Sequence, residues 1–336
     1  MSKVEDAMRE YSGWCRAIGI DNLEKLAQVQ RNGRTIPLIN LCEARQERKY
    51  AEIANQIYWN KDKCRVVMMS GPSSSGKTSS SLRIAQQCRV LGLNPKVIEL
   101  DNYFVDREHT PKLPDGEYDF EALEAMDVNF LVTQLEDLME GREVELPKFD
   151  FVTGKRHFEG TRMHLEKDDI LFMEGIHALN PALTPGMDTN RFFKIYISAL
   201  SALPGGEKVH NSTTDKRLLR RIVRDNRTRG ISPAQTILRW PSVRAGETRN
   251  IFPYEENADI VFNSSTLYDL PLLKKYSQPL LEAIGEDSKA YDKAQSLLSF
   301  MELVIPLTDE EVSAIPPTSI MREFIGGQLL ANLSVD

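Results

Sequence analysis

The chain has 336 residues and a formal net charge of −7; 41% of its residues are hydrophobic and 27% are charged. These values are typical of a globular protein that folds in water, and no apolar run approaches the length of a membrane-spanning helix. The acidic balance argues against a nucleic-acid partner. Four widely spaced cysteines form no C-x-x-C pair, which fits a reduced, cytoplasmic setting rather than a disulfide or zinc framework.

Residues 1–63 are predicted to form a mainly helical N-terminal extension. Val4, Met8, Tyr11 and Cys15 recur at helical spacing, and residues 44–59 give a second amphipathic stretch. Between them, residues 34–40 suggest a short strand that a proline interrupts. This part of the chain shows no pattern that carries chemistry.

Residues 66–78 (VVMMSGPSSSGKT) match G-x-x-x-x-G-K-[ST] directly after an apolar run and before a helical pattern. This is the strand-to-helix context of the phosphate-binding P-loop, which is favoured over an ordinary Ser/Gly-rich helix cap. The loop amides would surround phosphate oxygens, Lys77 would neutralise the β- and γ-phosphates, and Thr78 would offer its hydroxyl to Mg²⁺. We therefore predict that a nucleoside triphosphate is bound by Gly71, Pro72, Ser73, Ser74, Ser75, Gly76, Lys77 and Thr78.

Two further apolar runs end in an acid. Residues 96–100 lead into Asp101, and residues 169–173 lead into Glu174. In an open parallel sheet, ligands bind outside the carboxyl ends of the strands. Asp101 is therefore a candidate base, with a helix or turn cap as the alternative. Glu174 is a candidate ligand of Mg²⁺ or of its water.

The remaining pattern predicts an α/β fold. Helices are expected at residues 78–91 and 128–139, a β-hairpin at about 143–165, and further buried strands at 192–197 and 258–262. This set suits a P-loop kinase fold, in which a mainly parallel sheet is flanked by helices. The exposed aromatic residues of the hairpin suggest a lid or a wall for a ligand.

Residues 213–249 are rich in arginine. Arg217, Arg220, Arg221 and Arg224 fall at i, i+3, i+4 and i+7, which would place four guanidinium groups on one helix face. In an acidic protein such a face needs a counter-anion, and a bound triphosphate would supply it. The alternative is a solvated basic helix.

These motifs together resemble the uridine kinase and phosphoribulokinase family, over about residues 64–265 and in the same order along the chain. The motifs are the P-loop, Asp101 with Tyr103, the Tyr118–Asp119 turn, residues 147–151, Glu174–Gly175, the arginine segment 215–225, Arg229–Gly230 and the strand at 258–260. The helical extensions at both ends exceed the minimal family core and resemble those of the longer bacterial uridine-kinase-like proteins. The resemblance implies a kinase core at 64–268 with helical extensions at 1–63 and 269–336.

The resemblance also implies roles for individual residues. ATP and Mg²⁺ would be the cofactors, and Mg²⁺ would lie near Thr78, Glu174 and Asp101. Asp101 would be the catalytic base, with Lys77, Arg220 and Arg224 assisting transfer. Arg221 and Arg229 would contact the phosphates as part of a lid at about 213–249. The acceptor would be a small nucleoside-like molecule, held by Asp119, Tyr103, Phe149, Arg217 and Gln235.

Two positions depart from the uridine kinase pattern. Phe149 stands where those enzymes have a tyrosine, and Gly154 stands where they have a histidine that reads the pyrimidine. Loss of hydrogen-bonding groups relaxes or redirects the choice of acceptor. A sugar phosphate, a pantothenate-like alcohol and a non-catalytic nucleotide-binding module therefore stay open as alternatives. The terminal helices could cover the core or form the interface of a homo-oligomer.

Overall fold

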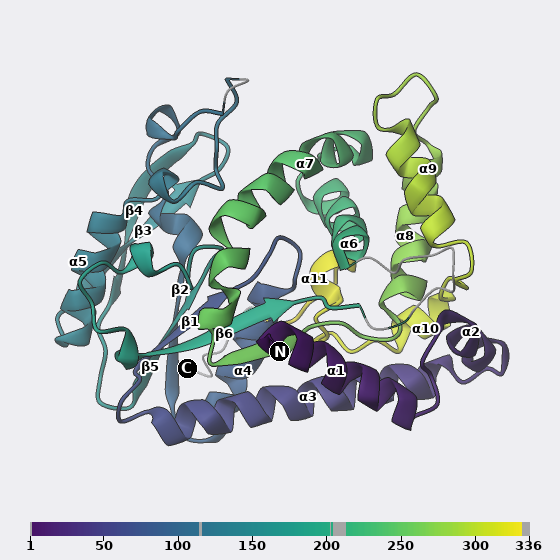
Figure 1. Ribbon diagram of the computed structural model, residues 1–336. Coiled ribbons are helices and arrows are strands. Elements are labelled where there is room, and N and C mark those ends of the chain that lie inside the picture. Colours follow the sequence, from purple (N-terminus) through teal and green to yellow (C-terminus); the bar gives the residue numbers. More distant parts are fainter. Residues whose placement is uncertain (1, 114–115, 202, 204–212, 331–336) are drawn as a thin grey trace.

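A five-stranded parallel sheet forms the centre of the molecule in the computed structural model, which describes residues 2–113, 116–201, 203 and 213–330. The strands lie in the order β2-β5-β1-β6-β7 (Figure 1). They are β1 (Val66–Ser70), β2 (Asn94–Glu99), β5 (Asp169–Glu174), β6 (Phe192–Ser198) and β7 (Ile260–Asn263). The predicted α/β fold with a mainly parallel sheet is confirmed.

Helices cover both faces of this sheet. Because side chains alternate along a strand, Val66 and Met68 of β1 face one layer and Val67 and Met69 face the other. The first layer contains α5 (Val128–Met139), and the second contains α3 (Thr35–Asn60) and α4 (Lys77–Val90). Burial on both faces explains why the strands read as continuous apolar runs.

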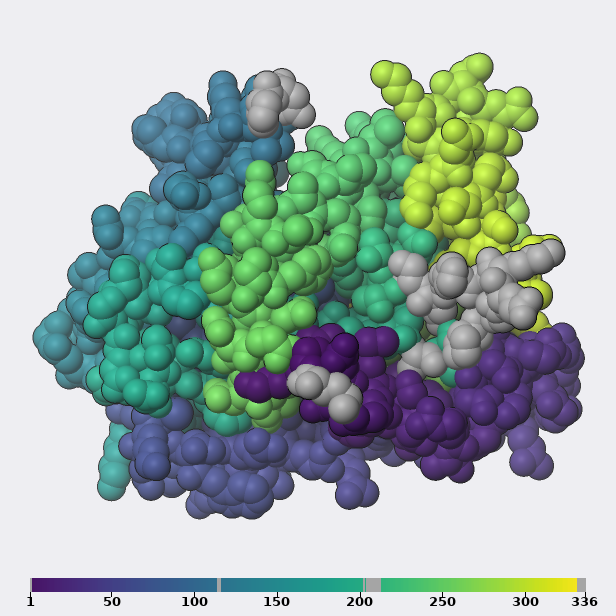
Figure 2. Space-filling view, in the orientation of Figure 1, coloured from purple at the N-terminus to yellow at the C-terminus, as the bar shows by residue number. Residues whose placement is uncertain are grey.

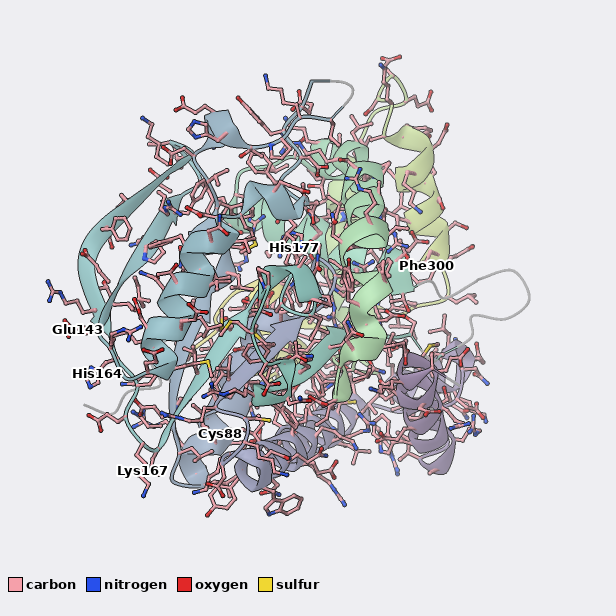
Figure 3. All side chains as sticks on the ribbon, turned by 60° about the vertical axis from the view of Figure 1, so that its left-hand side comes forward. Cys88, Glu143, His164, Lys167, His177 and Phe300 are labelled. Atoms are coloured by element: carbon pink, nitrogen blue, oxygen red, sulfur yellow. The ribbon has the colours of Figure 1, made fainter. Side chains whose placement is uncertain are left out.

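A separate two-stranded antiparallel sheet, formed by β3 (Val144–Asp150) and β4 (Lys155–Met163), is the predicted hairpin. β3 packs against η1 (Leu100–Tyr103), the single 3₁₀ turn that follows β2. The labelled Glu143, His164 and Lys167 lie at the outer edge of this part of the molecule (Figure 3). The hairpin therefore borders the end of β2 rather than extending the central sheet.

The N-terminal extension is helical, as predicted, but the strand expected at residues 34–40 is wrong. That segment forms the first turns of α3, after α1 (Lys3–Ala17) and α2 (Leu23–Arg31). Pro37 is the third residue of α3, where a backbone N–H has no intrahelical acceptor, so proline costs little there. Leu38, Ile39 and Cys42 lie on the buried face of this helix.

Both terminal extensions share one hydrophobic core with the arginine-rich segment. That core joins residues of α1, α2 and the start of α3 to α6 (Thr213–Thr228), α7 (Pro233–Asn250) and the C-terminal helices. These last are α8 (Asp269–Glu282), α9 (Tyr291–Phe300), α10 (Asp309–Ser313) and α11 (Arg322–Ile325). In Figure 2, α8 and α9 lie on one side of α6 and α7, and the lobe of residues 100–113 and 116–125 lies on the other.

Short 3₁₀ helices connect the remaining elements. They are η2 (Arg107–His109), η3 (Leu123–Ala125), η4 (Pro181–Leu183), η5 (Thr189–Arg191) and η6 (Phe252–Asn257). Within the described ranges, every helix is too short or too polar to cross a membrane.

Candidate active site

The loop between β1 and α4 has the backbone of a phosphate cradle. Ser74 and Gly76 have φ angles of 57° and 85°, and Gly76 precedes the first turn of α4. Left-handed residues in such a loop turn neighbouring N–H groups toward one concavity, and the helix start adds a positive dipole end. Gly71 has no room for a side chain, because a Cβ atom there would lie 2.0 Å from the carbonyl oxygen of Ile197.

The sheet register brings two acids to this loop. Glu174 of β5 pairs with Met69 of β1 on one side and with Glu99 of β2 on the other. The carboxyl ends of β2, β5 and β1 therefore meet at one edge, with Asp101 two residues beyond β2. This register places Glu174, and with it the residues that follow β2, at the edge of the sheet where the phosphate loop begins.

Thr78 and Glu174 form the side of the site that suits a magnesium ion. The Thr78 hydroxyl donates a hydrogen bond to Oε2 of Glu174 over 3.1 Å. Burial raises the pKa of Glu174 to about 7, and Lys77 opposes this shift. No cluster of three metal-ligating side chains occurs in the described ranges. This donor set fits Mg²⁺, which usually binds one or two protein oxygens together with substrate phosphates and water.

Asp101 lies two residues beyond β2, and the region bordered by the phosphate loop, Glu174 and Asp101 is called the crevice here. Solvent reaches its side chain, yet the surrounding protein raises the pKa of its carboxyl group, and Lys77, Arg229 and Arg224 lower it. Among described residues its carboxylate has no hydrogen-bond or ion-pair partner. An acid that is near three cations and has no committed partner is available to a ligand hydroxyl.

Asp225 organises the arginines that face this crevice. It is buried, and its carboxylate lies 3.2 Å from Nε of Arg221, 2.8 Å from Nη2 of Arg224 and 3.6 Å from Nε of Arg229. Arg221 also donates to Oγ of Ser73 over 2.8 Å. One acid thus fixes three guanidinium groups beside the phosphate loop and leaves the cluster with net positive charge.

The model of the phosphoribulokinase / uridine kinase family matches residues 66–270, which is more than half of the chain. This chain is a member of that family. A uridine kinase from Macrococcus caseolyticus is 31% identical over 201 residues, which cover 59% of this chain and 87% of the relative. A uridine kinase from Bacillus subtilis is 29% identical over 198 residues, which cover 58% and 84%.

A solved structure of D-glycerate 3-kinase from Cryptococcus neoformans aligns over 88% of both chains, with 14% identity and a TM-score of 0.30. This likeness is too weak to support an argument about the acceptor. Membership of a kinase family agrees with the loop, the two acids and the arginines of Asp225.

Two predicted arginines do not face the crevice in this family member. Arg217 is buried, pairs with both oxygens of Glu247 at 2.5 and 2.8 Å, and donates to the carbonyl of Ser73 over 3.0 Å. Arg217 was expected to contact the acceptor, but its guanidinium group braces the phosphate loop from behind. The ring of Trp240 covers it.

Arg220 was expected to assist catalysis, and its side chain is also fully buried. Its Nη2 atom lies 2.6 Å from Asp269 and 3.1 Å from the carbonyl oxygen of Ser264, and Nη1 reaches the carbonyl of Ser75 at 3.5 Å. Ser75 belongs to the loop itself, whereas Ser264 and Asp269 follow β7. The predicted basic face is therefore split: Arg217 and Arg220 support the loop, whereas Arg221 and Arg224 border the crevice.

Tyr103 and Gln235 were expected to bind the acceptor, but the Tyr103 hydroxyl and the Gln235 side-chain oxygen form hydrogen bonds within the chain. Tyr103 is 1% exposed and donates to Gln134 over 2.8 Å inside the core. Gln235 lies in the first turn of α7, where its side chain accepts from the N–H of Ser232 as part of a capping box. The Tyr103 hydroxyl thus lies in the core, whereas the exposed Gln235 uses its side-chain oxygen to cap α7.

Asp119 and Phe149 were also expected to hold the acceptor, and Phe149 belongs to an aromatic cluster. Asp119 pairs with Arg249 of α7 at 2.7 Å. Phe149 is buried, and its ring centroid lies 5.6 Å from that of Phe104 and 5.1 Å from that of the more exposed Phe151. This cluster is defined as Phe104, Phe120, Phe149 and Phe151.

The Arg107 side chain covers Gly154, where a Cβ atom would lie 2.7 Å from it. Arg107 also donates to the carbonyl of Phe151 over 2.6 Å. A histidine at position 154 would not fit this arrangement. The structure thus links the absence of that histidine to an arginine that holds the hairpin turn.

Glu121 and His177 are site neighbours that sequence reasoning missed. Burial raises the pKa of Glu121 to about 7, and the charges that act on it are Arg221, Glu247, Lys77 and Asp101. His177 lies in the interior (Figure 3), and burial lowers its pKa to about 4. The only signal for Glu121 was its position two residues after Asp119.

Proposed function

We propose that this chain transfers the terminal phosphoryl group of ATP to a hydroxyl group of a nucleoside-like small molecule, of the uridine or cytidine type. One observation carries this proposal: the carboxyl ends of β1, β5 and β2 lie at one edge of the sheet, next to the arginines that pair with Asp225. This edge combines a phosphate loop, the Thr78–Glu174 pair that suits magnesium, and the unpaired carboxylate of Asp101. Family membership agrees with it.

Each side chain has a distinct task in this proposal. The loop amides and Lys77 hold the β- and γ-phosphates, while Arg221, Arg224 and Arg229 balance charge that develops on the transferred group. Magnesium bound at Thr78 and Glu174 would neutralise phosphate charge. Asp101 accepts the proton of the attacking hydroxyl.

The acceptor would lie between Asp101, Asp119 and the aromatic cluster. Asp119 is suited to hold sugar hydroxyls, and the exposed part of Phe151 offers a surface for a planar base. Positioning contributes much of the rate in phosphoryl transfer, so the spacing of these groups selects the acceptor.

An acceptor panel tests the proposal. Purified full-length chain is mixed with Mg²⁺ and ATP or GTP, and ADP or GDP formation is measured with uridine, cytidine, other nucleosides, sugar phosphates and pantothenate. Turnover with a pyrimidine nucleoside supports the proposal. Turnover only with a sugar phosphate or another alcohol overturns the acceptor class, and tight ATP binding without any turnover indicates a nucleotide-binding module.

A further inference from the structure

The C-terminal segment reaches into the first turn of α4. Ser79 directly follows Thr78, and both its N–H and its hydroxyl donate to Oε2 of Glu323, over 3.3 and 2.6 Å. The side-chain amide of Gln328 donates to the same Ser79 hydroxyl over 2.7 Å. A carboxylate from α11 thus occupies an N–H group at the start of the phosphate-binding helix.

Several contacts hold this segment, defined here as residues 316–330, against the site. Ile320 packs so closely on Gly76 that a Cβ atom there would lie 2.4 Å from its Cδ1 atom. Arg227 of α6 donates to the carbonyls of Phe324 and Glu323, each over 3.1 Å. Arg83 of α4 donates to the carbonyl of Thr318 over 2.6 Å. The segment is therefore attached to both helices that carry phosphate-site residues.

The position of Glu323 is one that a phosphate group would use. Backbone N–H groups of the loop and of the first helical turn surround the α- and β-phosphates in P-loop proteins, and the helix dipole favours an anion there. Two anions cannot accept from one N–H group without strong repulsion.

We propose that Glu323 competes with a phosphate of the nucleotide, and that residues 316–330 form an autoinhibitory plug whose Glu323–Ser79 contact nucleotide binding breaks. This inference rests on the proposed function, because it requires a nucleotide at the loop. Displacement of the Glu323 carboxylate frees the N–H and hydroxyl of Ser79, while Met321 and Phe324 stay in the core that this segment shares with α6. The observed affinity for nucleotide is then lowered by the free energy needed to break the Glu323–Ser79 contact.

A merely structural role makes the opposite prediction. Gly76 provides no side-chain cap for α4, so Glu323 could act only as a remote cap. Loss of a cap lowers stability and leaves nucleotide affinity unchanged or weaker. Loss of a competitor raises affinity. The two roles are separated by the sign of the change in affinity.

The test measures ADP and ATP binding to the full chain by calorimetry in the presence of Mg²⁺. Glu323→Gln removes the charge and keeps the shape, and Glu310→Gln is the matched control, an exposed acid of the same region. We expect about tenfold tighter binding for Glu323→Gln and no change for the control. Equal or weaker binding by Glu323→Gln overturns the plug.

The outcomes also separate this inference from the proposed function. Tighter binding by Glu323→Gln supports the plug even if no acceptor is ever phosphorylated. If the unmodified chain binds nucleotide and Glu323→Gln binds it equally well, the plug alone is overturned. Absence of nucleotide binding by both proteins overturns the nucleotide site and the plug together.

Amide hydrogen exchange provides a second readout that needs no variant. Addition of ADP and Mg²⁺ should increase exchange in residues 316–330 while it protects the loop at 71–79. Unchanged or slower exchange in residues 316–330 would show that the segment stays in place, which contradicts displacement.

Discussion

The guanidinium group of Arg217 and the carboxylate of Glu247 form a buried two-point ion pair, and the same carboxylate accepts from the N–H of Ser73 over 2.9 Å. Burial favours the neutral form of Glu247, but the Arg217 and Arg244 charges hold its pKa below the ordinary value. Helices α6 and α7 thereby fix the phosphate loop from behind.

Arg217→Met should therefore destabilise the fold. It leaves Glu247 as a buried charge with less compensation, which costs about 3–5 kcal/mol. Urea denaturation measures the free energy of unfolding. Arg162→Met, which breaks the exposed pair between Arg162 and Glu143, is the control and should cost less than about 1 kcal/mol. Similar losses in both variants would show that the buried pair has no special weight.

Asp101→Asn should lower kcat with the best acceptor by about 10²–10⁴-fold, because the amide cannot accept the proton of the hydroxyl. The KM for ATP should change little. Steady-state ADP formation measures both constants, with the exposed Asp292→Asn as control. A kcat within a factor of about two of the unmodified chain would remove Asp101 from the mechanism.

Glu121 should make stability depend on pH. Its pKa is raised to about 7 in the folded chain, from an ordinary value of 4.5, mainly by burial. The folded chain thus holds a proton that the unfolded chain releases, so this contribution to stability falls as pH rises from about 4.5 to 7.

Glu121→Gln removes this term. The variant should gain about 1–3 kcal/mol over the unmodified chain between pH 5 and pH 8, measured by urea denaturation at both values. The groups that face Glu121 are Lys77 of α4, Arg221 of α6, Glu247 of α7 and Asp101 beyond β2. A difference between the two proteins that stays constant with pH would contradict the assignment.

Gly71→Ala should disrupt the phosphate loop, because the added Cβ would meet the Ile197 carbonyl at 2.0 Å. Nucleotide binding should be lost and stability should fall. Gly13→Ala is the matched control: Gly13 lies inside α1, where a Cβ would meet only an arginine nitrogen at 3.9 Å, and alanine there should add about 1 kcal/mol. Thermal denaturation and calorimetry measure both effects.

The sequence was informative where function depends on local pattern. The loop, Asp101 and Glu174 were all predicted because each follows an apolar strand, and parallel strands bring their carboxyl ends to one edge. The register of β2, β5 and β1 follows this rule.

The sequence predicts that four arginines share one helix face, but it does not predict which of them are buried. Helical spacing placed four guanidinium groups together, but the partners that turn two of them inward, Glu247 and Asp269, lie 30 and 49 residues away. No local pattern reports such partners. Likewise, Pro37 suggested a broken strand, whereas burial of its neighbours by distant helices made the segment helical.

The core that joins both chain ends to α6 and α7 sets a limit on dissection. A version trimmed to residues 66–270 would keep every family motif but lose the apolar partners of Leu218, Leu219 and Ile222, which are fully buried in the intact chain. Such uncovered surface promotes aggregation. The two terminal extensions thus hold α6, and with it the arginines that pair with Asp225, in position beside the phosphate loop. Changes in these extensions would therefore alter the crevice even though no crevice residue is replaced.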